Sequence, residues 1–182
     1  MHRVEPALRV ATADDRVAAE QLMKASIAAI FPRYYDERQT ESAVRYIAEV
    51  DGTLIADGTY FVLETSGEIV GCGGWSKRNL LYTGSGHSAT DSRLLDPATE
   101  PARVRAMFVR ADWTRRGLGR RILEECEAAA RRDRFWQLAL MATLPGVPLY
   151  SAYGFRSLEE LEITMPDGVP LACVAMDKPV AL

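Results

Sequence analysis

The sequence of 182 residues is poor in the side chains that usually bind metals or form disulfides. It contains two histidines, His2 and His87, and three widely separated cysteines, Cys72, Cys126 and Cys173. An odd number of scattered cysteines is typical of small buried residues in a reducing compartment and not of a disulfide framework. We therefore expect no metal centre, no disulfides and a cytoplasmic location.

Long apolar runs are missing as well. No stretch approaches the length that crosses a bilayer, and the first residues lack the apolar region of a signal peptide. The chain also shows no internal repeat and no linker. Its 48% hydrophobic and 26% charged residues suit one domain with a sizeable core. We therefore expect residues 1–182 to form a single domain that binds no membrane.

The chain as a whole has no excess of positive charge, since its formal net charge is -3, but one segment has such an excess. Five arginines lie between positions 110 and 121: Arg110, Arg115, Arg116, Arg120 and Arg121. Because they crowd one turn and do not line a face with interleaved aromatics, we do not expect nucleic-acid binding. The local excess of positive charge favours a phosphate-bearing ligand instead.

The same segment has the pattern of a phosphate site. The apolar residues 107–109 predict a buried strand, a turn rich in Arg and Gly follows, and then an amphipathic helix begins. Gly117 and Gly119 leave the backbone amides at the helix start uncovered by side chains. These first amides have no partner within the helix, and the helix dipole favours negative charge there. A strand, a bare turn and a helix N-terminus in this order are typical of phosphate binding.

Two common phosphate motifs do not fit this segment, and a third does. The dinucleotide pattern Gly-x-Gly-x-x-Gly would need a glycine where Ile122 stands, and a P-loop would need a lysine where Arg120 stands. Residues 114–119, Thr-Arg-Arg-Gly-Leu-Gly, resemble instead the pyrophosphate loop of the GNAT superfamily of N-acetyltransferases, Gln/Arg-x-x-Gly-x-Gly/Ala. Thr114 departs from this pattern at its first position, and both glycines match it.

A second segment resembles the same superfamily. Residues 149–155, Leu-Tyr-Ser-Ala-Tyr-Gly-Phe, are similar to its Phe/Leu-Tyr-x-x-x-Gly-Phe segment and follow the first motif by about thirty residues. Between the motifs, the pattern predicts a helix over 120–133, a strand over 135–143 and a short helix that ends at Gly154. This order of elements is that of the GNAT core.

The rest of the chain completes the predicted architecture. Strands are indicated at 8–10, 59–64, 69–76, 103–109 and 171–177, with a hairpin turn at Ser66-Gly67. Helices are indicated at 15–30, before Pro32, and from near Thr40. The polar stretch 79–100 shows no clear periodicity. The resemblance implies an α/β (α+β) fold with a mixed, mostly antiparallel sheet that is flanked by helices and splayed at its two central strands.

The resemblance also implies acetyl-CoA as the acyl donor, bound in the splay. The pantetheine arm would pair with the backbone of the strand that leads into the phosphate turn, and the pyrophosphate would lie on the amides of the turn. Thr143 stands where the family often has an asparagine that contacts the cofactor arm. The expected cofactor-binding residues are Phe108, Val109, Arg115, Arg116, Gly117, Leu118, Gly119, Arg120 and Thr143.

Acetyl transfer needs a neutral amine and a proton for the leaving thiolate. Tyr150 occupies the tyrosine position of the family and is the expected general acid, although a tyrosine in such an apolar segment is often only a core residue. Glu100, just before the cofactor strand, is the expected base. Asp96, His87 and the absence of a dedicated base stay open as alternatives.

These features predict an N-acetyltransferase that moves the acetyl group of acetyl-CoA to a primary amine of a small molecule or peptide by direct attack. Asp91, Asp96 and Glu100 would suit a cationic amine. Family members are frequently dimers, so a homodimer stays open. The alternative function is a non-catalytic acyl-CoA-binding sensor or regulatory module.

Overall fold

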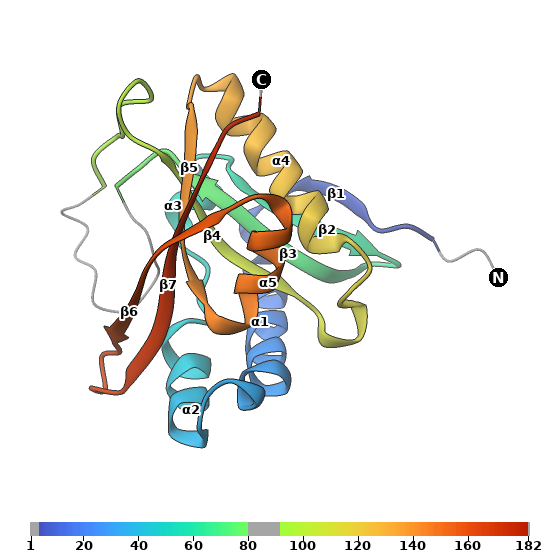
Figure 1. The fold of residues 1–182 in the computed structure, drawn as a ribbon. Coiled ribbons are helices and arrows are strands. Elements are labelled where there is room, and N and C mark those ends of the chain that lie inside the picture. The colour runs from blue at the N-terminus through green and yellow to red at the C-terminus, as the bar shows by residue number, and fades with distance from the viewer. Residues whose placement is uncertain (1–3, 80–91, 182) are drawn as a thin grey trace.

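The computed structural model describes residues 4–79 and 92–181, and in these residues the strands form one seven-stranded sheet (Figure 1). Its strands are β1 (Ala7–Val10), β2 (Tyr60–Thr65), β3 (Glu68–Ser76), β4 (Ala102–Val109), β5 (Gln137–Thr143), β6 (Arg156–Thr164) and β7 (Pro170–Pro179). Its helices are α1 (Arg16–Ile30), α2 (Glu37–Tyr46), α3 (Gly52–Ala56), α4 (Leu118–Arg132) and α5 (Val147–Tyr153).

The strands follow the order β1-β2-β3-β4-β5-β7-β6 across the sheet. All neighbouring strands run antiparallel except β4 and β5, which are parallel. Parallel neighbours need a crossover connection, and α4 supplies it here. The sheet is therefore mixed and mostly antiparallel, and the predicted fold class is confirmed.

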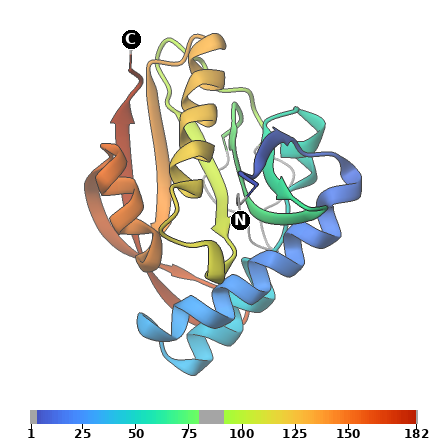
Figure 2. The ribbon, with the colours of Figure 1, turned by 90° about the vertical axis from the view of Figure 1, so that its right-hand side faces the viewer.

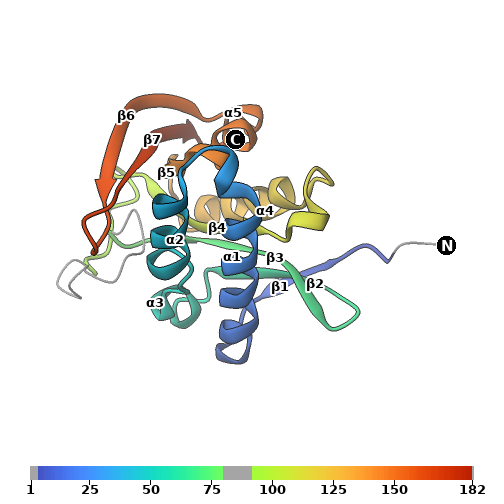
Figure 3. The same ribbon diagram turned by 90° about the horizontal axis from the view of Figure 1, so that it is seen from below.

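Helices pack on both faces of the sheet and create two hydrophobic cores. Figure 2 shows α4 running along the central strands, and Figure 3 shows α1 and α2 side by side. Side chains of β2 alternate between the two cores: Phe61 and Leu63 pack in the core that contains α4, and Tyr60 and Val62 pack in the core that contains α1 and α3. This alternation follows from the two-residue repeat of a strand.

Two helical segments differ from the prediction. Helix α2 begins at Glu37, three residues before the predicted start, because Asp36 and Gln39 form a reciprocal cap in which Asp36 accepts the backbone N–H of Gln39 at 2.8 Å. Helix α3 was not predicted. It is five residues long, and the Asp51 carboxylate accepts the backbone N–H of Thr53 at 2.8 Å.

The three cysteines are buried, as predicted, and none of them is in a disulfide. Within residues 4–79 and 92–181, no group of acidic, histidine and cysteine side chains is arranged to hold a metal ion. No helix in this described part of the chain is both long and apolar enough to cross a membrane.

Candidate active site in the splay between β4 and β5

The two central strands separate soon after they meet. β4 and β5 are paired only through Ala102 with Leu138 and Arg103 with Ala139, although β4 continues to Val109. Beyond Arg103 the edge of β4 that faces β5 therefore has no strand partner in the described structure. The predicted splay between the cofactor strands is confirmed.

A bulge in β4 accounts for this separation. The register with β3 shifts between the pairs Cys72–Phe108 and Gly74–Arg105, so β4 has an additional residue there. Ala106 lies in the bulge with a φ of 50°, and its carbonyl oxygen accepts a hydrogen bond from the Tyr60 hydroxyl at 3.1 Å. A bulge bends a strand and increases its twist, which turns the end of β4 away from β5.

A cleft of about 650 Å³, its open mouth included, lies in the splay. Its lining comes from both cores: Val104 and Tyr150 belong to the core of α4, whereas Phe108 and Ile163 pack with the core of α1 and α3. The cleft therefore passes through the sheet from one face to the other. The residues that line it are Ile47, Val104, Arg105, Ala106, Met107, Phe108, Leu140, Met141, Thr143, Tyr150, Ile163 and Cys173.

The predicted phosphate turn follows the end of β4. Gly117 precedes α4 with a φ of 79°, and no side chain caps the helix. The first backbone bond into the helix is from the Arg121 N–H to the Gly117 carbonyl oxygen at 3.0 Å. No residue of the described structure accepts a hydrogen bond from the backbone N–H groups of residues 116–120. Five adjacent donors at a helix N-terminus are thus available to an anion.

The two glycines of this turn have different structural roles. Gly117 has a left-handed backbone, which costs other residues strain. Gly119 has no such backbone. A Cβ at this position would lie 2.7 Å from Cδ2 of Leu149, so α5 packs closely against α4 at Gly119. Both motifs of the sequence therefore meet at this contact.

The arginines of the turn differ in their partners. Two of them, Arg115 and Arg116, form no ion pair with a described residue, and Arg116 stacks 4.7 Å from the ring centre of Trp113. The positive charge left for a ligand is therefore that of Arg115 and Arg116. The other three are ion-paired, Arg110 with Glu68 and Asp112, Arg120 with Glu124, and Arg121 with Glu5.

Tyr150 lies on α5 and lines the cleft with little exposed surface. Its ring packs edge-on against Phe155, with 5.8 Å between ring centres, and Gly146 leaves room for it because a Cβ there would lie 2.8 Å from the ring. Burial raises the pKa of the Tyr150 phenol well above its ordinary value. The hydroxyl therefore keeps its proton at neutral pH, and it has no hydrogen-bond partner in the described residues.

The structure brings Phe108, Thr143 and Tyr150 together in the cleft, and the phosphate turn follows the same strand. Val109 ends β4 beside them, and its carbonyl oxygen accepts a hydrogen bond from the Ser26 hydroxyl of α1 at 3.0 Å. Ser26, which sequence reasoning missed, thus fixes α1 across the end of β4.

Glu100 lies elsewhere. It precedes β4, at the end where β4 and β5 are still paired, and it is absent from the cleft lining. Arg93 donates to both of its carboxylate oxygens, at 2.8 and 2.9 Å, and the backbone N–H of Asp96 donates at 2.7 Å. These bonds, that of Arg93 first, lower the pKa of Glu100 to about 2. His87, an alternative base, and Asp91, expected near a cationic amine, lie outside the described residues.

A family model described as the acetyltransferase (GNAT) domain matches residues 56–157, which is more than half of the chain. The chain belongs to the GNAT acetyltransferase family. The matched segment runs from the end of α3 through the phosphate turn to the start of β6, so it contains both sequence motifs. Among curated proteins, no sequence matches this GNAT chain.

Solved GNAT structures share the whole fold at low sequence identity. A GCN5-related N-acetyltransferase from Rhodopseudomonas palustris is 20% identical, with a TM-score of 0.73 over 98% of this chain and 99% of the other. PaiA N-acetyltransferase from Thermoplasma acidophilum, in complex with coenzyme A, is 12% identical with a TM-score of 0.67 over 97% and 99%. YncA from Salmonella typhimurium, with its cofactor acetyl-CoA, is 16% identical with a TM-score of 0.63 over 97% and 95%.

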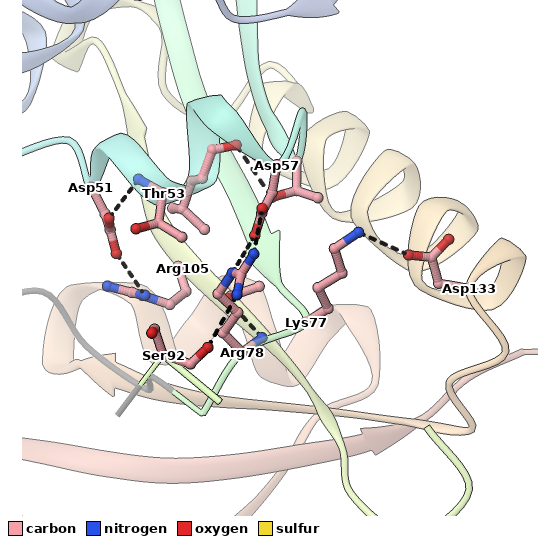
Figure 4. Close-up of polar contacts among 11 residues, drawn as sticks. Asp51, Thr53, Asp57, Lys77, Arg78, Ser92, Arg105 and Asp133 are labelled. Atoms are coloured by element: carbon pink, nitrogen blue, oxygen red, sulfur yellow. Dashed lines mark hydrogen bonds and ion pairs between the residues drawn. The ribbon is translucent and has the colours of Figure 1, made fainter. Parts of the chain in front are cut away.

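Two further residues of this GNAT chain hold elements around the cleft. The Tyr35 hydroxyl donates to the Ala172 carbonyl at 2.7 Å and accepts the Leu144 N–H at 2.8 Å. It therefore ties the α1–α2 connection to the end of β5. Arg105 of β4 is buried in the cleft wall and pairs with Asp51 (Figure 4). No motif marks either residue, because their partners come from distant segments.

Proposed function

We propose that this GNAT protein is an N-acetyltransferase that transfers the acetyl group of acetyl-CoA to a primary amine of a small molecule or peptide. The observation that carries the proposal is the row of unpartnered backbone N–H groups at residues 116–120, next to the cleft. Coenzyme A contains a pyrophosphate, and a bare helix N-terminus binds phosphate through such donors and through the helix dipole. The acetyl-CoA and coenzyme A found in related structures support this assignment.

The residues around the turn fit the other parts of the same ligand. Arg115 and Arg116 have no carboxylate partner in the described residues and would add positive charge near the phosphates. The unpaired edge of β4 at Phe108 and Val109 would pair with the amides of the pantetheine arm, as an added strand would. Thr143, across the cleft on β5, would contact the arm.

Acetyl-CoA supplies a thioester, and in the proposed reaction a C–N bond to the amine forms while the C–S bond breaks. Tyr150 holds its proton at the cleft and would donate it from the phenolic oxygen to the leaving sulfur. Such a positioned acid is typically worth about 10²–10⁴ in rate.

No carboxylate belongs to the described cleft lining. Glu100 is held by Arg93 at the closed end of the splay, and a carboxylate whose pKa is about 2 is a weak base. We therefore leave Glu100 out of the proposed mechanism. The acceptor amine instead reaches the thioester after it has lost its proton to solvent, and the surrounding side chains only have to orient it.

The test of the phosphate turn uses two variants that differ in one charge. Gly117→Asn and Gly117→Asp have the same size, and both residue types tolerate a left-handed backbone better than most. A Cβ at Gly117 meets nothing within 4 Å. Calorimetry should detect coenzyme A binding to the wild type, and Gly117→Asp should bind at least about tenfold more weakly than Gly117→Asn, because a carboxylate repels phosphate.

Equal affinity of the two variants, or no uptake of coenzyme A by the wild type, would contradict the proposed site. Thiol release from acetyl-CoA with a panel of amines then tests the transfer itself. Tight binding without thiol release for any amine would favour the non-catalytic acyl-CoA-binding module.

A further inference from the structure

The part of the cleft on the side of α1 and α3 contains a buried cation. Arg105 is one of the lining residues, and only 4% of its surface is exposed. Arginine is almost never buried to this extent without partners, because removing its charge from water is costly. Arg105 follows the β4 pairing with β5 and immediately precedes the bulge at Ala106, so the strand itself fixes its position.

Asp51, the partner of Arg105, uses only a small part of the hydrogen-bonding capacity of this side chain. Arg105 Nη1 donates to Asp51 Oδ2 at 3.2 Å (Figure 4), and the second oxygen of Asp51 is occupied by the N–H of Thr53. A guanidinium has five N–H donors in a planar fork. In the described part of the chain no other group accepts a hydrogen bond from Arg105. Most of its donors are therefore left for a ligand.

The neighbouring walls of the cleft are apolar. Ile47, Phe108, Met141 and Ile163 line the cleft on this side of the sheet, together with the Arg105 cation. Within the described lining there is no carboxylate that could hold a cationic amine. The acids that suggested such a substrate do not contribute: Asp96 and Glu100 lie outside the lining.

We propose that Arg105 binds the carboxylate of the acceptor, so that the substrates are free amino acids with an apolar side chain. This inference rests on the proposed function. The planar guanidinium fork matches a carboxylate, the apolar walls match an aliphatic or thioether side chain, and the amine of the same molecule is directed toward the thioester. The positive charge also favours the neutral form of a nearby amine, which is the form that attacks.

The wild-type test compares amino acids with their own amides. Thiol release from acetyl-CoA is measured with L-methionine and L-methioninamide, and with L-leucine and L-leucinamide. The amides lack the carboxylate, and their amino groups are less basic, so at neutral pH their intrinsic reactivity is the higher. We expect kcat/KM for each acid to exceed that of its amide at least tenfold.

Variants then assign the preference to Arg105. In Arg105→Lys and Arg105→Gln the ratio of kcat/KM for each acid to kcat/KM for its amide should fall at least tenfold. The matched control is Arg78→Gln. Arg78 pairs with Asp57 at 2.8 Å (Figure 4), so a carboxylate at each end of α3 binds one arginine. Arg78 does not line the cleft. This control should keep the preference for acids.

Amides that turn over as well as the acids in the wild type would overturn the inference and leave the proposed function intact. Variants of Arg105 that keep the preference would overturn the role of this residue in the same way. The absence of thiol release with every amine would overturn both. If the Arg105 variants do not fold, the wild-type comparison alone decides.

Discussion

At the scale of single residues, the proposed acid catalysis depends on how Tyr150 is held. The phenol is buried against Phe155 and has no hydrogen-bond partner among the described residues, and burial is the main reason that its pKa is raised. A second tyrosine three positions later differs. The Tyr153 hydroxyl donates to Glu127, a residue that also binds Lys178, and it lies outside the cleft lining. The two side chains are therefore a natural comparison.

Replacement of the acid should slow the reaction without loss of donor binding. Tyr150→Phe is expected to lower kcat by about 10²-fold or more, because it removes the proton donor, while the affinity for coenzyme A stays within about threefold. In the wild type the raised pKa keeps the phenol protonated, so kcat should not fall through its ionisation up to about pH 10. Steady-state rates between pH 6 and pH 10 measure both effects. Tyr153→Phe should retain kcat, and an unchanged kcat in Tyr150→Phe would refute the acid role.

Gly146 permits the position of that ring. Gly146→Ala would place a Cβ 2.8 Å from Cε2 of Tyr150. The Gly146 φ of -81° is open to alanine, so the backbone should not be strained. We expect a lower kcat, because the ring must move, with the free energy of unfolding reduced by no more than about 1–3 kcal/mol. In the Tyr150→Phe background the same change should have little further effect on kcat. Additive losses would show that Gly146 acts by another route.

At the scale of elements, the start of α1 is fixed to the edge of the sheet by charge. Arg9 of β1 donates to both carboxylate oxygens of Asp15, at 2.7 and 2.8 Å, and Asp15 accepts the backbone N–H of Thr12 at 2.8 Å. The bonds from Arg9 are the main reason that the pKa of Asp15 is lowered to about 2. Because the folded-state pKa is below the unfolded one, this contribution is present above about pH 4 and is lost as pH falls toward 2.

Removal of the Asp15 charge should therefore destabilise the protein only where the carboxylate is ionised. Asp15→Asn is expected to lower the free energy of unfolding by about 1–2 kcal/mol at pH 7, a value reduced for the partial exposure of Arg9, and by much less near pH 2. Urea denaturation at several pH values measures this difference. The control Asp14→Asn changes an exposed neighbour and should alter the free energy of unfolding by no more than about 0.5 kcal/mol at each pH. A difference that does not depend on pH would rule out the ion pair as its cause.

The elements themselves were largely predictable, because the strands and α4 carry strong apolar patterns. Ile122 and Cys126, spaced for one face of α4, are both fully buried. The errors in the helices fall where the signal is a cap and not a periodicity, and β6, whose side chains are mostly exposed, has no apolar pattern that would predict it. Asp36 marked the true start of α2 and Asp51 that of α3, but a five-residue helix is too short to show a repeat.

At the scale of the whole molecule, the proposed reaction would place the donor and the acceptor on separate sides of the cleft that passes through the sheet. A direct transfer then needs both ligands bound together. Cys173 lines the cleft and would be the candidate for a covalent acetyl carrier, but burial raises its pKa to about 12 and keeps it as a poorly nucleophilic thiol.

Initial rates with both substrates varied should therefore give intersecting double-reciprocal lines. Parallel lines would indicate a covalent intermediate and a ping-pong order instead. Cys173→Ala should keep kcat within about threefold, because the thiol takes no chemical part in the proposed direct transfer and the cavity left by one sulfur is small. Loss of turnover in a variant that still folds and binds coenzyme A would contradict direct transfer.

The site was predictable only where it is local in sequence. The turn at Gly117 and the segment around Tyr150 are continuous motifs, and their roles in cofactor binding and acid catalysis stay predictions. Ile47, Arg105 and Ile163 come from three segments that only the strand order brings together. Glu100 was selected because it precedes β4, but the sequence does not show that Arg93 holds it at the closed end of the splay.

The described backbone joins β4 to β5 through two residue pairs, so strand pairing connects the two halves of the sheet at one end of the splay. Elsewhere, the half formed by β1 to β4 and the half formed by β5, β7 and β6 are connected by helices and side chains, such as Tyr35, whose hydroxyl bonds to Ala172 of β7. A molecule that lies in the splay and bonds to both β4 and β5 would add the connection that the two strands lack there. Occupancy by the donor would then stiffen the whole protein and not only the residues that touch it.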